Sequence, residues 1–271
     1  MSTEPTYRDR LLDGIIALAR EAGREIMQIY DQPEIGVRTK GDDTPVTIAD
    51  MAAHRVISDG LSELTPDIPI LSEESASIPF DERSRWQRYW LVDPLDGTRE
   101  FISRNGEFTV NIALIDQGEP VLGVILVPVG GVCYFARRGM GAFKEVPGRP
   151  AQPIRCRELP QGRPLIVAGS RSHAGVSLQG FLDRVGDHTL VSVGSSLKSC
   201  MVAEGKADVY PRFGPTSEWD TAAAQCIVEE AGGQITDTQL VPLRYNTKDS
   251  LLNPHFLVFG DAAIDWTTLL D

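Results

Sequence analysis

The sequence predicts an α+β fold of layered helices and sheets in two lobes. Its first half carries two helical patterns of apolar residues followed by strand-like segments, whereas its second half alternates short strands with helices. A stretch rich in Pro, Gly and Arg, residues 147–164, separates the two patterns. With 271 residues, of which 42% are hydrophobic, the chain can bury a substantial core. We therefore expect an N-terminal α+β lobe over residues 1–147 and a C-terminal α/β lobe over residues 148–271.

Two amphipathic helices are expected near the N-terminus. Apolar residues recur at helical spacing from Leu11 to Ile29, with charged residues between them, and the pattern ends before Pro33. Thr47 followed three residues later by Asp50 has the form of a capping box, which begins a second helix that continues through Leu61.

An antiparallel meander is expected to follow these helices. The apolar segments Phe108–Ile115 and Pro120–Val129 are joined by the short polar turn Asp-Gln-Gly-Glu, which is typical of a hairpin, and Val132–Ala136 has the pattern of a third strand. Beyond the boundary, strands are expected at 165–168, 190–193, 209–213 and 256–259, and helices at 174–185, 195–204, 221–230 and the C-terminus.

Composition limits the partners and the compartment. The formal charge of −12, from 38 acidic and 26 basic residues, argues against a nucleic-acid polymer, because phosphate-backbone binding needs a basic surface. The four cysteines form no Cys-x-x-Cys pair, so we expect reduced thiols, no disulfide and no zinc. The polar N-terminus and the shortness of the longest apolar run predict no export signal, no transmembrane segment and a cytoplasmic protein.

The segment Asp93-Pro94-Leu95-Asp96-Gly97-Thr98 follows an apolar strand and places two carboxylates close together. Carboxylates repel each other and prefer water to burial, so this pair indicates a bound cation. Oxygen ligands without Cys or clustered His select hard cations such as Mg²⁺ or Mn²⁺. The Gly-Thr turn that follows begins a helix, where an anion binds readily. Metal and phosphate side by side suit metal-assisted phosphoryl hydrolysis.

Other candidate residues have structural alternatives. Asp50 is explained equally by its capping box, Asp220 by capping a helix that begins at Thr221, and Glu73 by a solvated acidic loop. Lys198 can be an ordinary helix-surface residue, and Arg212 an ordinary cation at a strand end.

The segment 93–98, with Ser72-Glu73-Glu74 before it and Trp219-Asp220 after it, resembles the inositol monophosphatase superfamily of Mg²⁺-dependent, lithium-sensitive phosphatases. The segments 44–50, 96–101, 194–198 and 210–215 further resemble the bacterial 3'(2'),5'-bisphosphate nucleotidases of that superfamily. The resemblance covers essentially the whole chain. It implies an αβαβα sandwich of two lobes with the active site between them.

The resemblance also implies roles for individual residues. It implies two or three Mg²⁺ ions per site, with inhibition by Li⁺ and Ca²⁺. The implied metal ligands are Glu73, Asp93, the carbonyl of Leu95, Asp96 and Asp220. The implied catalytic residues, which orient and deprotonate the attacking water, are Asp50 and Thr98, with Glu73 near them. The implied substrate-binding residues are Gly97 and Thr98 at the scissile phosphate, and His173, Ser195, Lys198, Arg212 and Asp220 around the nucleotide.

The implied activity is hydrolysis of the 3'-phosphate of adenosine 3',5'-bisphosphate to AMP and phosphate in sulfate assimilation, and of the corresponding phosphosulfate as a further substrate. An inositol or sugar monophosphatase is the alternative enzyme. A catalytically silent metal or nucleotide sensor is the alternative of another class, against which Asp50 and Thr98 argue, since a sensor needs no water activation. The sequence leaves the oligomeric state and peripheral association with the inner membrane open.

Overall fold

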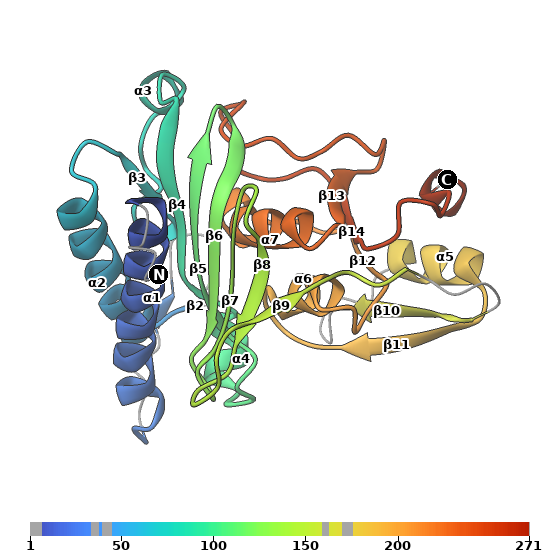
Figure 1. Cartoon of the computed structure of the whole chain (residues 1–271), viewed down its shortest axis with the longest axis horizontal. Helices are drawn as coiled ribbons and strands as arrows, with labels where there is room; N and C mark the ends of the chain where they lie inside the picture. The colour runs from blue at the N-terminus through green and yellow to red at the C-terminus, as the bar shows by residue number, and fades with distance from the viewer. Residues whose placement is uncertain (1–6, 34–37, 40–44, 159–162, 170–175, 271) are drawn as a thin grey trace, which may run out of the picture.

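The computed structural model describes residues 7–33, 38–39, 45–158, 163–169 and 176–270. Helices and sheets alternate in five layers (Figure 1). Helices α1 and α2 cover one face of the larger sheet, α6 and α7 lie between the two sheets, and α5 packs on the far face of the smaller sheet. The expected layered α+β fold is therefore confirmed. The helix bounds are α1 Tyr7–Tyr30, α2 Ile48–Leu64, α5 Val176–Val185, α6 Leu197–Ala203 and α7 Glu218–Glu230.

The larger sheet has seven strands in the order β3-β4-β5-β6-β7-β8-β9. Every neighbouring pair is antiparallel except β3 and β4, which run parallel, so the expected meander and its hairpin are confirmed. The strands are β3 Ile70–Ser72, β4 Arg88–Asp96, β5 Thr109–Asp116, β6 Glu119–Val127, β7 Val132–Arg137, β8 Gly141–Glu145 and β9 Gln152–Ile154.

The smaller sheet has five strands in the order β11-β10-β12-β14-β13. Strand β10 pairs in parallel with β11 and β12, while β14 is antiparallel to β12 and β13. The chain passes from one sheet to the other between β9 and β10. The division into lobes at residues 147 and 148 stays a prediction. The strands are β10 Leu165–Gly169, β11 His188–Ser192, β12 Val209–Arg212, β13 Gln234–Asp237 and β14 Phe256–Phe259.

Short elements complete the described chain. A two-stranded pair, β1 and β2, precedes α2, and the C-terminal element is a 3₁₀ turn in place of the expected helix. None of the helices among the described ranges is long and apolar enough to cross a membrane. The bounds are β1 Arg38–Thr39, β2 Pro45–Val46, η1 Glu73–Ser75, α3 Phe80–Arg83, α4 Thr98–Ile102 and η2 Trp266–Leu269.

Helix α7 begins earlier than the sequence pattern suggests. Ser217 is its N-cap and Asp220 is the acid of a capping box, so the helix starts at Glu218 and not at Thr221. Asp220 therefore lies in the first turn of the helix and not before it. This placement turns its carboxylate back toward the N-terminal end of α7.

The backbone of α7 approaches the larger sheet closely. The three alanines Ala222, Ala223 and Ala224 are buried, and the helix packs against β5 and β6. At Gly123 in β6, a Cβ atom would lie 2.4 Å from the carbonyl oxygen of Ala223. Because that oxygen belongs to the backbone, only glycine fits there without moving the helix.

Replacing this glycine should loosen the contact between α7 and the sheet. We expect Gly123→Ala to lower the free energy of unfolding by about 1–3 kcal/mol through overpacking, which thermal or urea unfolding measures. The control is Gly14→Ala in α1, where the nearest atoms are Leu64 methyl groups at 3.4 and 3.5 Å. That substitution should be neutral or slightly stabilising, since alanine favours a helix. Equal stability of Gly123→Ala and the native protein would contradict this account of the interface.

Candidate active site

Strand β4 presents two aspartates where its pairing with β5 is interrupted. The register shifts between Asp93 and Asp96, and the N–H of Leu95 donates to Asp93 Oδ1 at 3.0 Å. The next residue, Gly97, has φ +92, a left-handed conformation that glycine adopts without strain, and α4 follows at once. The bulge therefore turns both carboxylates toward the same end of the strand.

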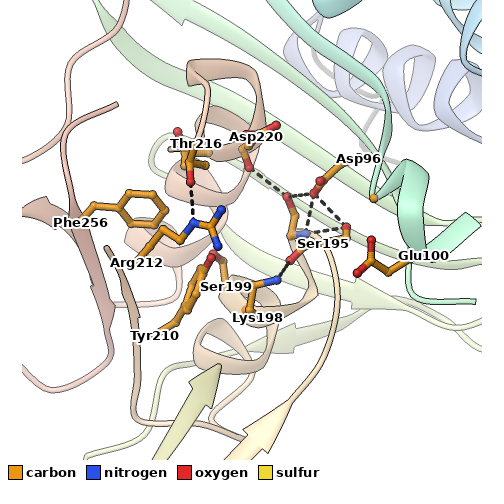
Figure 2. Close-up of a pocket in the computed structure, with 13 residues that line it drawn as sticks. Asp96, Glu100, Ser195, Lys198, Ser199, Tyr210, Arg212, Thr216, Asp220 and Phe256 are labelled. Carbon is orange, nitrogen blue, oxygen red and sulfur yellow. Dashed lines mark hydrogen bonds between the residues drawn. The ribbon is translucent and has the colours of Figure 1, made fainter. Parts of the chain in front are cut away.

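Asp220 reaches this place from α7, which lies between the two sheets. Its Oδ2 accepts a hydrogen bond from the Ser217 N–H at 2.8 Å, which fixes the side chain in the first helical turn. Ligand oxygens of Asp93, Asp96 and Asp220 all lie within 4.8 Å of one another. The sequence-predicted acidic cluster is thus brought together by β4 and α7, and Figure 2 shows Asp96 and Asp220 on neighbouring elements.

The electrostatics of the cluster are unfavourable without a cation. Burial, together with the charges of Glu73, Asp96 and Asp220, raises the pKa of Asp93 well above its usual range. Burial and the charges of Asp96 and Glu73 raise the pKa of Asp220 to about 8. A set made only of carboxylates is the kind that hard divalent cations prefer, so these residues fit a metal such as Mg²⁺.

Glu73 lies beside this cluster. It is in η1, directly after β3, and β3 pairs with β4. Its charge raises the pKa of both Asp93 and Asp220. It is not one of the three residues whose oxygens converge within 4.8 Å. Metal binding by Glu73 and by the carbonyl of Leu95 stays a prediction.

Asp50 and Thr98 are in contact, and their role in activating water stays a prediction. The Thr98 hydroxyl donates to Asp50 Oδ1 at 3.3 Å. Asp50 Oδ2 accepts from the Thr47 N–H at 2.7 Å, which is one of the two bonds of the α2 capping box, and also from the Thr47 hydroxyl at 2.5 Å. Burial raises the pKa of Asp50, and the hydrogen bonds from Thr47 oppose that shift. Asp50 therefore caps α2 through Oδ2 and contacts Thr98 through Oδ1, so the structural and the functional explanations both apply to this carboxylate.

Asp96 is also the point at which the segment before α6 is attached to β4. Its Oδ2 accepts hydrogen bonds from the Ser195 hydroxyl at 2.9 Å, the Ser196 N–H at 2.7 Å and the Ser196 hydroxyl at 2.9 Å, and longer ones at 3.5 Å from Thr109 and Asn111. Ser195 has φ +54, which is uncommon for a residue with a side chain. This strained backbone position lies where Ser195 and Ser196 both donate to the Asp96 carboxylate.

Lys198 lies on α6 with its side chain buried in this site. The alternative that it is an ordinary residue on the helix surface is therefore wrong. The side chain is 6% exposed, and its ammonium donates to the carbonyls of Ser195 at 2.6 Å and Val193 at 3.3 Å. Burial lowers its pKa to about 8. The two carbonyls take two of the three N–H bonds of the ammonium, which also lies over the Tyr210 ring, 5.3 Å from its centroid.

Arg212 lies at the end of β12. Its Nε donates to the Thr216 hydroxyl at 2.7 Å (Figure 2), and one Nη donates to the Pro215 carbonyl at 2.9 Å. Lys198 and Arg212 both line a cavity of about 140 Å³ that also includes Asp96 and Asp220.

The same cavity has lining residues that the sequence did not assign. Tyr210 and Glu100 lie inside quoted motifs without a role, whereas no sequence signal pointed to Thr216 or Phe256. Ser196 was likewise part of a motif, and its side chain and N–H both bond to Asp96. The predicted substrate residue His173 lies outside the described residues. Gly97 and Ser195, for which substrate binding stays a prediction, line the cavity.

The chain belongs to the inositol monophosphatase family, whose family model matches residues 8–261. Among curated proteins it is similar to the 3'(2'),5'-bisphosphate nucleotidase CysQ of Escherichia coli (strain K12), with 54% identity over 249 residues, which cover 92% of this chain and 99% of the relative. It is 38% identical over 270 residues to the CysQ of Haemophilus influenzae, which covers 97% of this chain and 98% of the relative.

Solved structures agree with this assignment. The crystal structure of CysQ from Bacteroides thetaiotaomicron, described as a bacterial member of the inositol monophosphatase family, superposes with a TM-score of 0.81 at 41% identity, covering 94% of this chain and 98% of that chain. The extragenic suppressor protein suhB of Bartonella henselae gives a TM-score of 0.80 at 28% identity over 96% and 97% of the two chains. The inositol monophosphatase-like fold expected from the sequence is confirmed.

Proposed function

We propose that the chain is a Mg²⁺-dependent phosphatase that removes the 3'-phosphate of adenosine 3',5'-bisphosphate, giving AMP and phosphate. The observation that carries the proposal is that Asp96 and Asp220 of the acidic cluster line one cavity with two cations, because a bisphosphate needs both a metal site and a second anion site. The relatives named as 3'(2'),5'-bisphosphate nucleotidases support the choice of substrate. The corresponding phosphosulfate, which shares the 3'-phosphate, is a second candidate substrate in sulfate assimilation.

Asp93, Asp96 and Asp220 would hold the metal, with Glu73 and the Leu95 carbonyl completing the ligands of two or three ions. A bound divalent cation supplies positive charge that neutralises the phosphoryl oxygens and favours deprotonation of water. Family membership supports sensitivity to Li⁺ and Ca²⁺. We also infer a cytoplasmic location, supported by the four cysteines being free thiols.

Asp50 and Thr98 would handle the proton of the attacking water. A threonine hydroxyl is a poor base alone, but this hydroxyl donates to Asp50, so its lone pairs are available to accept a hydrogen bond from water. Asp50 is itself held by Thr47 and cannot swing away from Thr98 without giving up the capping box. The pair would thus fix the direction from which water meets phosphorus.

Arg212 and Lys198 would meet the second phosphate. The net charge of −12 repels a bisphosphate nucleotide, so local cations are needed to bind it. The guanidinium of Arg212 uses two of its N–H groups on Thr216 and Pro215, which leaves three for a ligand. Both residues line the cavity that also contains Asp96, where the scissile phosphate would bind.

Phosphate release in Mg²⁺ from adenosine 3',5'-bisphosphate and from inositol monophosphate tests the function. Native protein should prefer the nucleotide, and Thr98→Ala should lower kcat by about 10² or more with a smaller change in KM, as expected for general-base work. The exposed residue Thr268, on the C-terminal turn, provides the control Thr268→Ala, which should leave both constants unchanged. A native preference for inositol monophosphate would favour the alternative enzyme, and a change in KM alone would contradict the role of Thr98.

Comparing two nucleotides isolates the second phosphate. Arg212→Ala should lower kcat/KM for adenosine 3',5'-bisphosphate by about tenfold to a hundredfold, since each charge-assisted contact contributes roughly 1.5–3 kcal/mol. Hydrolysis of adenosine 3'-monophosphate, which lacks the 5'-phosphate, should change little. The matched control is Arg10→Ala on the exposed side of α1. An equal decrease in kcat/KM for both nucleotides would mean that Arg212 supports the fold and does not bind the 5'-phosphate.

A further inference from the structure

Glu100 is an acidic residue in the cavity that the proposed mechanism does not use. It lies in the first turn of α4, it is half-buried, and its side chain lines the same cavity as Lys198 and Arg212. The other charged side chains of the cavity, Asp96, Lys198, Arg212 and Asp220, all make hydrogen bonds. The carboxylate of Glu100 makes none with the residues that the structure describes.

The position of Glu100 is close to the proposed scissile-phosphate turn. Its Oε2 lies 3.3 Å from the place that a Cβ of Gly97 would occupy, and its Cγ lies 2.6 Å from the corresponding place at Gly194. Two glycines therefore make room for this side chain. Arg212 is on the other side of the Asp96–Ser195 contact, so the cavity has an acidic end and a basic end (Figure 2).

The two ends can be matched to the chemistry of a ribose 3'-phosphate. The C3' atom that carries the scissile phosphate has two ring neighbours, C2' with its hydroxyl and C4' with the arm to the 5'-phosphate. If the 5'-phosphate points to Arg212, the 2'-hydroxyl points away from it. That direction leads to Glu100.

We infer that Glu100 is a specificity residue that accepts a hydrogen bond from the 2'-hydroxyl of the nucleotide. The inference rests on the proposed function. A carboxylate repels a phosphate and suits a hydroxyl donor, so its presence at one end of an anion-binding cavity favours a ligand with a hydroxyl there. Asp96 is not available for this contact through Oδ2, which already accepts hydrogen bonds from Ser195 and Ser196.

A simpler role for Glu100 gives a different result. Its negative charge favours the charged form of Lys198, and a purely electrostatic role of that kind would act on any bisphosphate nucleotide. If Glu100 instead binds the 2'-hydroxyl, its replacement would lower activity on the ribonucleotide and leave activity on the 2'-deoxy analogue unchanged. The ratio of kcat/KM for a ribonucleotide to that for its 2'-deoxy analogue separates the two roles.

The experiment measures this ratio with adenosine 3',5'-bisphosphate and 2'-deoxyadenosine 3',5'-bisphosphate. Native protein should favour the ribonucleotide by about tenfold to a hundredfold, as expected for a hydrogen bond to a charged acceptor. Glu100→Ala should bring the ratio close to one, and Glu100→Gln, which keeps an acceptor of similar size, should give an intermediate value. Arg99→Ala, on the same helix and exposed, should retain the native ratio.

Two outcomes would overturn the inference. One is a native ratio close to one, and the other is a Glu100→Ala protein that keeps the native ratio while losing activity on both substrates. Failure of the proposed function is distinct, because native protein would then release phosphate from neither nucleotide. Circular dichroism of each variant shows whether a change in this ratio results from a loss of folded structure.

Discussion

Mutual repulsion among Asp93, Asp96 and Asp220 is the constraint on which the rest of the site depends. Their ligand oxygens lie within 4.8 Å, and burial of Asp93 makes its charge still less favourable. A folded chain keeps such a group only if other contacts hold each member in place. Here the bulge in β4, the capping box of α7 and the hydroxyls of Ser195 and Ser196 do so. A divalent cation would remove the repulsion and leave those contacts intact.

The layered fold brings these residues together from distant parts of the chain. Asp220 reaches β4 because α7 lies directly on the larger sheet, and that close approach depends on Gly123 facing the Ala223 carbonyl. The Ser196 hydroxyl bonds to both Asp96 and the Asp220 carbonyl, so α7 and β4 are also linked through the segment before α6. Packing between the sheets and the geometry of the metal site are therefore parts of one arrangement.

The sequence predicts the parts of the site that have local signatures. The capping box of Thr47 and Asp50 predicts where α2 begins, and the aspartate pair after an apolar strand predicts the cation site, because both signals lie within a few residues. What the sequence does not give is set by tertiary contacts. The burial of Lys198 and the positive φ of Ser195 result from hydrogen bonds that join separate elements.

Strand prediction has the same limit. The meander from β5 to β7 is predicted because its strands are long and apolar, whereas β8 and β9 are short and carry Gly, Lys and Pro, and pairing with a neighbour decides their structure. The sequence pattern predicts the start of α7 too late, because aspartate is a common N-cap residue and Asp220 fits that role. Only the structure shows that Ser217 is the N-cap.

Anomalous diffraction from crystals grown with Mn²⁺ shows whether Asp93, Asp96 and Asp220 bind a divalent cation, because Mn²⁺ takes the same oxygen ligands as Mg²⁺ and scatters anomalously. We predict a peak at about 2.0–2.6 Å from carboxylate oxygens of Asp93, Asp96 and Asp220, the range that hard cations and oxygen ligands adopt. The peak should be absent from Asp93→Asn crystals of the same form. Native crystals in Mn²⁺ with no peak among these three carboxylates, or with the strongest peak elsewhere, would contradict the proposed metal site.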